Sequence, residues 1–285
     1  MNYFKLPVIA ILLCLGTLSL QQVANAELAI EEIVSQFNEL NRGRGARFTF
    51  STANTQIINN YYIGEHMLAK ASDGDFVPSS LLGAYKSGTT SGSNYFNTFC
   101  VELDETITTT TYYGQLSYDP TSGQSVSTSG KVLSLGAAYL YQQFAAGTLQ
   151  GFNYDNNRVV SAVALQNAIH FLTHQTPLTP TAWTGASANT FLTYLLSVNE
   201  SEDYWMSDYN LNHTYTDLGK DFANSAVFML MVGADKDKIQ DQLFVAKVDR
   251  PDTDVPEPAT IILWLGGLSA LGFGVKKRRK TTPPV

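Results

Sequence analysis

Strand-forming sequence on both sides of a helical stretch most limits how this 285-residue chain can fold. Alternating apolar and polar residues, or runs of Thr and Tyr, predict one or two strands at 47–63 and further strands at 95–103, 106–118, 226–233 and 242–248. Apolar residues at helical spacing predict helices at 27–40, 131–149, 158–173 and 189–198. Because most helices form one run between strands, we predict an α+β fold: a β-rich barrel or sandwich with an inserted helical subdomain.

The first 26 residues have the three parts of a secretory signal peptide. Lys5 supplies the positive charge, residues 6–20 are apolar, and Ala24-Asn25-Ala26 forms a small-residue cleavage site. The apolar run is short for a membrane span, and no stop-transfer pattern follows it. We therefore predict a signal peptide at 1–26 that is cleaved before Glu27, rather than a retained membrane anchor.

The C-terminal end also has three parts, which follow the predicted extracellular domain at 27–248. They are a linker at 249–258 that contains Val255, Pro256, Glu257 and Pro258, an uncharged apolar stretch at 259–275, and a Lys/Arg cluster at 276–280. The apolar stretch is at the short limit for a transmembrane helix, and the basic cluster would hold its end in the cytoplasm. We therefore predict a transmembrane and basic sorting segment at 259–280.

This three-part end resembles the PEP-CTERM sorting signal of Gram-negative bacteria. The resemblance implies an exosortase as a partner, a membrane peptidase that cleaves near Pro256-Glu257-Pro258 and releases the protein or transfers it to the cell surface. It also implies that the C-terminal helix anchors the chain transiently in the inner membrane before processing. A simple tail anchor is the alternative, but it would not need the Pro-Glu-Pro string, which blocks helix continuation.

The charge of the central region narrows the possible partners. Six of the eighteen Lys and Arg side chains lie in the two terminal segments, at 1–26 and 259–280, whereas all twenty-five acidic side chains lie outside these segments. Removing both segments therefore shifts the formal charge from −7 to −13. Nucleic acids and anionic membranes attract positive charge, so neither is an expected partner of the exported part.

Cys100 is the only cysteine expected in the exported chain, because Cys14 lies in the predicted signal peptide. An unpaired cysteine in an exported protein suggests either intermolecular pairing or a reactive thiol. The simplest alternative is that Cys100 is a small buried apolar residue in a strand.

Two strings indicate a chemical role for this thiol. Phe99-Cys100-Val101-Glu102 ends a predicted strand, and Leu165-Gln166-Asn167-Ala168-Ile169-His170 lies in a predicted helix. The pair resembles bacterial thioester domains, in which a cysteine and a glutamine in such strings form a thioester. The resemblance implies that Cys100 supplies the sulfur and Gln166 the acyl group. His170 stands where that family often has tryptophan; it could assist proton transfer or only pack.

Three functions follow from these residues. The first is a surface adhesin that bonds covalently to an extracellular nucleophile-bearing protein or polysaccharide through the Cys100–Gln166 thioester. The second is a structural or polysaccharide-associated matrix protein without a functional thioester. The third and weakest is a cysteine hydrolase that uses Cys100 with His170 or His174, because no orienting Asn or Asp can be named. We expect no enzyme activity, cofactor or metal site.

Overall fold

The computed structural model describes residues 27–58, 61–71, 95–102, 111–174, 183–184, 188–233 and 240–248. The chain divides into two units, 1–249 and 250–285, and every described residue belongs to the first. A helix over 27–38 comes first. The further elements are α2 (Leu40–Gly43), β1 (Ala46–Ile58), β2 (Tyr61–Lys70), β3 (Tyr95–Thr98), β4 (Thr111–Leu116), α3 (Leu135–Ala146), α4 (Arg158–Leu172), α5 (Thr190–Val198), α6 (Glu202–Met206), η2 (Thr216–Leu218), α7 (Lys220–Ala223), β5 (Ser225–Val232) and β6 (Gln242–Lys247).

The described strands form one antiparallel sheet in the order β3-β2-β1-β4-β5-β6. The chain just beyond β3 then meets the start of β6: the Val101 amide donates to the Asp241 carbonyl at 2.9 Å, and the Leu243 amide donates to the Phe99 carbonyl at 3.1 Å. These two bonds, which we call the seam, nearly close the sheet into a barrel. The mixed α+β class with a barrel-like sheet is thus confirmed.

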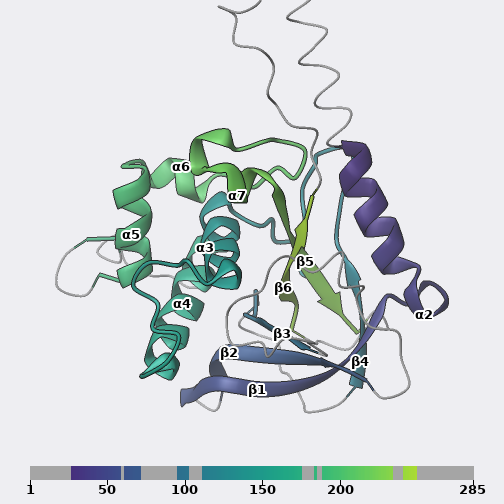
Figure 1. Cartoon of the computed structure of the whole chain (residues 1–285), viewed down its shortest axis with the longest axis horizontal. Helices are drawn as coiled ribbons and strands as arrows, with labels where there is room; N and C mark the ends of the chain where they lie inside the picture. Colours follow the sequence, from purple (N-terminus) through teal and green to yellow (C-terminus); the bar gives the residue numbers. More distant parts are fainter. Residues whose placement is uncertain are drawn as a thin grey trace, which may run out of the picture. The chain divides into compact units, whose positions relative to one another are not determined.

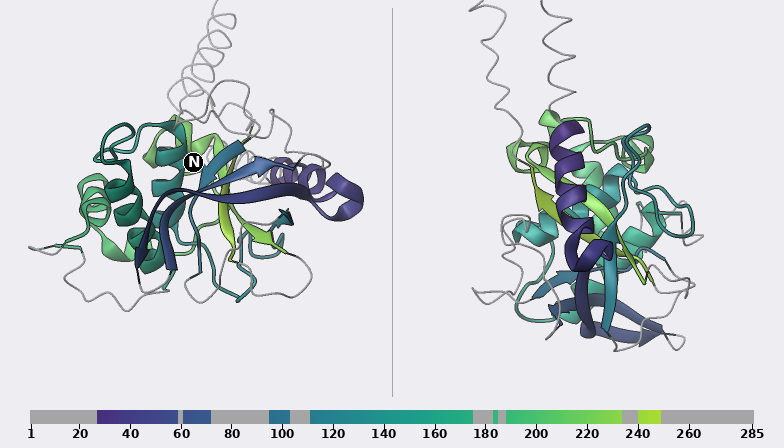
Figure 2. Two further views of the ribbon diagram at one scale, coloured as in Figure 1. Left: turned by 90° about the horizontal axis from the view of Figure 1, so that it is seen from below. Right: turned by 90° about the vertical axis from the view of Figure 1, so that its right-hand side faces the viewer.

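The helices α3 to α7 lie between β4 and β5 in the sequence. Figure 1 shows them gathered on one side of the barrel, with the helix over 27–38 on the other, and Figure 2 shows the same arrangement from two further directions. The 27–38 helix presents Phe37 to the barrel, where its ring lies 5.1 Å from that of Phe244. Phe96 lies 5.5 Å from Phe244 and 5.6 Å from Phe48. Edge-to-face aromatic packing therefore fills much of the barrel core.

Helix α3 has clear start and stop signals in its sequence. At the start of α3, the Ser134 side chain accepts a hydrogen bond from the Ala137 amide at 3.2 Å. At its end, Gly147 adopts a left-handed conformation, with φ of 73°. Such a cap satisfies amide groups that the first turn leaves unpaired, and glycine tolerates the left-handed turn.

Several predictions concern segments outside the described residues. These are the signal peptide at 1–26, the linker at 249–258 and the sorting segment at 259–280. Within the described ranges, no helix combines the length and apolar character needed to cross a bilayer.

Candidate functional site

Cys100 lies in the middle of the seam, where it forms an antiparallel bridge with Gln242. The two seam hydrogen bonds join the residues on either side, so Cys100 and Gln242 form a non-hydrogen-bonded pair. Side chains of such a pair lie close together on the same face of a sheet. The amide and carbonyl of Cys100 consequently point away from β6, toward the opposite edge of its own strand.

Gln166 occupies that opposite edge. Its Oε1 accepts a hydrogen bond from the Cys100 amide at 3.0 Å, and its Nε2 donates to the Cys100 carbonyl at 2.6 Å. The pairing of β3 with β2 ends at Thr98, opposite His66. The Gln166 carboxamide therefore continues the ladder where β2 no longer pairs, and both of its polar atoms are held against one residue.

His170 lies one helical turn beyond Gln166 on α4. Its Nε2 is 2.9 Å from Nε2 of Gln166. The backbone of Cys100 fixes the orientation of the carboxamide, so this nitrogen donates and the imidazole accepts. Burial, with a smaller repulsion from His66, lowers the pKa of His170 to about 3. The imidazole is therefore neutral near pH 7, with its proton on Nδ1.

The sulfur itself faces Gln242, whose Nε2 lies 3.1 Å from Sγ. Cys100 is almost fully buried. Burial raises the pKa of the Cys100 thiol far above its usual range; the Gln242 donor opposes this shift, and the charge of Glu102 adds to it. The thiol is thus protonated in the resting protein, and any reaction of the sulfur needs a group that stabilises the thiolate.

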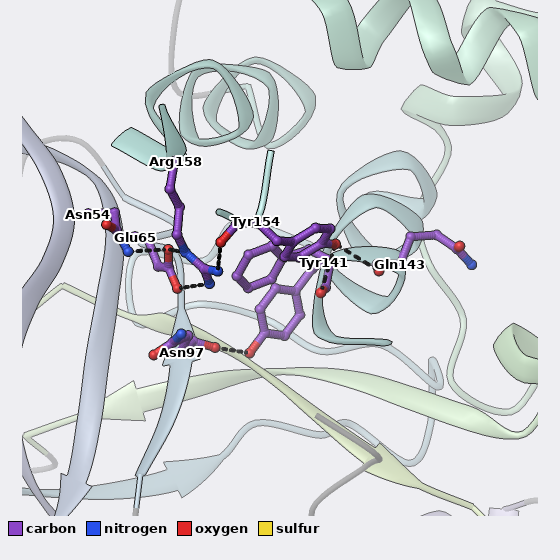
Figure 3. Close-up of polar contacts among 8 residues, drawn as sticks. Asn54, Glu65, Asn97, Tyr141, Gln143, Tyr154 and Arg158 are labelled. Carbon is purple, nitrogen blue, oxygen red and sulfur yellow. Dashed lines mark hydrogen bonds and ion pairs between the residues drawn. The ribbon is translucent and has the colours of Figure 1, made fainter. Parts of the chain in front are cut away.

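An ion pair fixes the start of α4 against β2, as Figure 3 shows. Two nitrogens of Arg158 donate to the two carboxylate oxygens of Glu65 at 2.6 and 2.7 Å, and a third donates to the Tyr154 carbonyl at 2.9 Å. Asn54 donates to the same carboxylate at 2.9 Å. Asn157, the residue before α4, makes no side-chain cap. Arg158 therefore anchors the helix that carries Gln166.

A second contact in Figure 3 holds the strand that leads to Cys100. The hydroxyl of Tyr141 on α3 donates to the carbonyl of Asn97 on β3 at 3.1 Å. Both residues are buried. The two helices α3 and α4 thus each make a polar contact with the strands that bring Cys100 into place.

Two buried carboxylates lie beside the seam. Asp241 accepts hydrogen bonds from the Thr128 amide at 2.6 Å and the Thr128 hydroxyl at 3.1 Å, and Glu102 accepts one from the Ser129 amide at 3.1 Å. Burial raises the pKa of Asp241 to about 7; the Thr128 amide opposes the shift and the charge of Glu102 adds to it. The Gln240 side chain donates to the Glu102 carbonyl.

The structure brings together the three residues that the sequence analysis selected, Cys100, Gln166 and His170. His174 is different: it follows the end of α4 with φ of 58° and is exposed, whereas Cys100 is buried. Gln242, at the start of a predicted strand, was not among the predicted site residues. The available signal was a glutamine at the start of an otherwise apolar strand. The predicted sorting residues Val255, Pro256, Glu257 and Pro258 lie outside the described residues.

Comparison with known proteins identifies one segment. Residues 254–280 match the PEP-CTERM protein-sorting motif. The chain therefore carries the sorting motif of an exported protein that an exosortase processes, as predicted. No curated protein and no solved structure matches the chain.

Proposed function

We propose that this chain is an exported surface or extracellular-matrix protein that binds its target covalently through a Cys100–Gln166 thioester. The observation that carries the proposal is the two-point contact between the Gln166 carboxamide and the backbone of Cys100. That contact holds the acyl carbon beside the residue that carries the thiol, 66 positions away in the sequence. Holding two reacting groups in place in this way supplies much of the advantage of an intramolecular reaction.

The geometry of the carboxamide favours attack by the sulfur. Its plane is aligned with the backbone hydrogen bonds of the strand, whereas the side chain of Cys100 projects from the face of the sheet. Rotation about the Cα–Cβ bond can therefore bring Sγ over the face of the carboxamide. The S–C bond forms, the C–N bond breaks, and ammonia leaves with the thiol proton.

The reverse direction gives the binding reaction. A primary amine or a hydroxyl of the target attacks the acyl carbon, the S–C bond breaks, and Cys100 regains its proton. By microscopic reversibility, the entering nucleophile takes the position of Gln166 Nε2, within reach of the neutral His170 nitrogen. His170 can accept a hydrogen bond from the nucleophile there and so orient it, while its lowered pKa makes it a weak base. The target is an extracellular protein or polysaccharide that offers such a nucleophile, and the bond formed does not dissociate.

Intact mass of the full chain, prepared without thiols or amines, tests this function. A thioester lowers the mass by about 17 Da because ammonia is lost, and methylamine then adds about 31 Da. Cys100→Ala and the shape-conserving Gln166→Glu should show neither change. A wild-type mass with no deficit refutes the proposal.

A second function has an observation of its own. The Gln166 carboxamide satisfies the amide and carbonyl of Cys100 where β2 ends, which is a structural task that needs no reaction. This arrangement fits a structural or polysaccharide-associated matrix protein. A full-mass chain that is strongly destabilised by Gln166→Leu would support this second function.

A further inference from the structure

Gln242 makes a contact with the reacting sulfur that the thioester chemistry above leaves unused. Its side chain is fully buried, and its Nε2 lies 3.1 Å from Sγ of Cys100. The same nitrogen donates to the Gln240 carbonyl at 3.2 Å. That carbonyl can only accept, so exchanging the two ends of the carboxamide would set one oxygen against another. The nitrogen therefore faces the sulfur, and the sulfur is the acceptor.

The other end of the same carboxamide is costly to bury. Oε1 of Gln242 has no hydrogen-bond partner among the described residues. An unsatisfied buried acceptor costs about 1–3 kcal/mol. An apolar side chain of similar size would avoid that cost, so the arrangement calls for a role that the nitrogen performs.

We propose that Gln242 is a third member of the reacting group, which stabilises the Cys100 thiolate by donating its amide hydrogen to Sγ. This inference rests on the proposed thioester. The sulfur carries negative charge twice, when it attacks Gln166 and when it is displaced from the acyl carbon by the target. A single donor therefore assists both formation and opening of the thioester, since a better-stabilised thiolate is also a better leaving group.

The position of Gln242 suits this role. The seam places it directly opposite Cys100, while Gln166 approaches from the other edge of the strand. Cys100 thus lies between a carboxamide that donates to its sulfur and a carboxamide that is held against its backbone. The two carboxamides differ in how they face the sulfur. Gln242 donates through a nitrogen in the plane of its amide, so it does not offer the sulfur the face of its own carbonyl carbon.

The experiment compares three variants of the full chain with the wild type. Gln242→Met keeps the length of the side chain and removes the donor, and Gln242→Glu keeps its shape and replaces the donor by an acceptor. Gln240→Met is the matched control: it removes a buried carboxamide from the same segment that donates to the Glu102 carbonyl and not to sulfur. Circular dichroism and thermal unfolding verify that each variant is folded.

Two quantities are measured by intact mass: the fraction of chains with the ammonia deficit, and the rate of methylamine addition between pH 6 and 9. We expect both Gln242 variants to form less thioester and to open it about tenfold more slowly, which corresponds to one charge-assisted hydrogen bond. The control should behave as the wild type does. If the loss of any buried carboxamide in this segment were enough to slow the reaction, the control would be slowed as well.

The possible outcomes separate the two proposals. If the wild type forms the thioester and the Gln242 variants form and open it at wild-type rates, the role of Gln242 is refuted and the thioester stands. Equal slowing in Gln240→Met also refutes it. If the wild type shows no mass deficit, both proposals fall together.

Discussion

The ion pair between Glu65 and Arg158 allows a quantitative test of how α4 is held. The Glu65 side chain is 0% exposed and that of Arg158 is 11% exposed, and two hydrogen bonds of 2.6 and 2.7 Å join them. Removing one partner of a buried pair leaves an uncompensated charge and costs about 3–5 kcal/mol. We therefore expect Glu65→Gln and Arg158→Met each to lower the free energy of unfolding by about 3 kcal/mol or more.

A double-mutant cycle measured by urea unfolding gives the coupling. The double variant Glu65→Gln/Arg158→Met retains no buried charge, so its loss should be smaller than the sum of the single losses by about 2–3 kcal/mol. Asn54→Ala is the control, because it removes one donor to the same carboxylate and leaves the pair intact. Strictly additive losses would contradict the idea that this pair anchors α4.

Two further predictions concern the seam and the turn before β1. The pKa of Asp241 is raised to about 7 in the folded protein, so the contribution of Asp241 to the free energy of unfolding falls as pH rises from about 4 to about 7. The pKa of His170 is lowered to about 3, so the contribution of His170 rises with pH between about 3 and 6.5. We measure the change in the free energy of unfolding between pH 5 and pH 6.5 by urea unfolding. Relative to the wild type, this change should be more positive in Asp241→Asn and more negative in His170→Phe. The same change in all three proteins would contradict these pKa shifts. Gly45 has φ of 80°, and a Cβ there would clash with the Gly114 carbonyl, whereas Gly43 has φ of 84° and open space around it. In the same assay, Gly45→Ala should therefore lose several kcal/mol of stability and Gly43→Ala about 1 kcal/mol. Equal losses would count against the clash.

The longer helices and strands were predictable because their apolar side chains recur at the spacing of a helix or a strand. The helix predicted at 158–173 is α4 at Arg158–Leu172, and the strand predicted at 242–248 is β6 at Gln242–Lys247. The segment at 47–63, by contrast, contains two strands that pair with each other, and β2 continues to Lys70. Weak alternation predicted one or two strands there, and it fixed neither the point where the first strand ends nor the far end of β2. The short helices α6 and α7 were missed because one turn carries no measurable period.

The residues of the candidate site were also only partly predictable from the sequence. The pairing of Cys100 with Gln166 came from a family resemblance, since no local pattern links residues so far apart. Glu65 and Arg158 were missed because a charged side chain in a sequence is usually solvated, and only the fold shows that these two are buried together. Gln242 was missed because its role depends on the seam, which joins two distant strand ends.

The anchoring of α4 at Glu65 has a mechanical consequence. If a target is bonded to Gln166 as proposed, it would pull on α4 and not on the strand of Cys100, since that reaction releases the sulfur. Tension would pass down the helix to Arg158 and into the β1–β2 hairpin, where ten residue pairs share the load. The barrel could then resist flow or shear while its freed thiol bears no force.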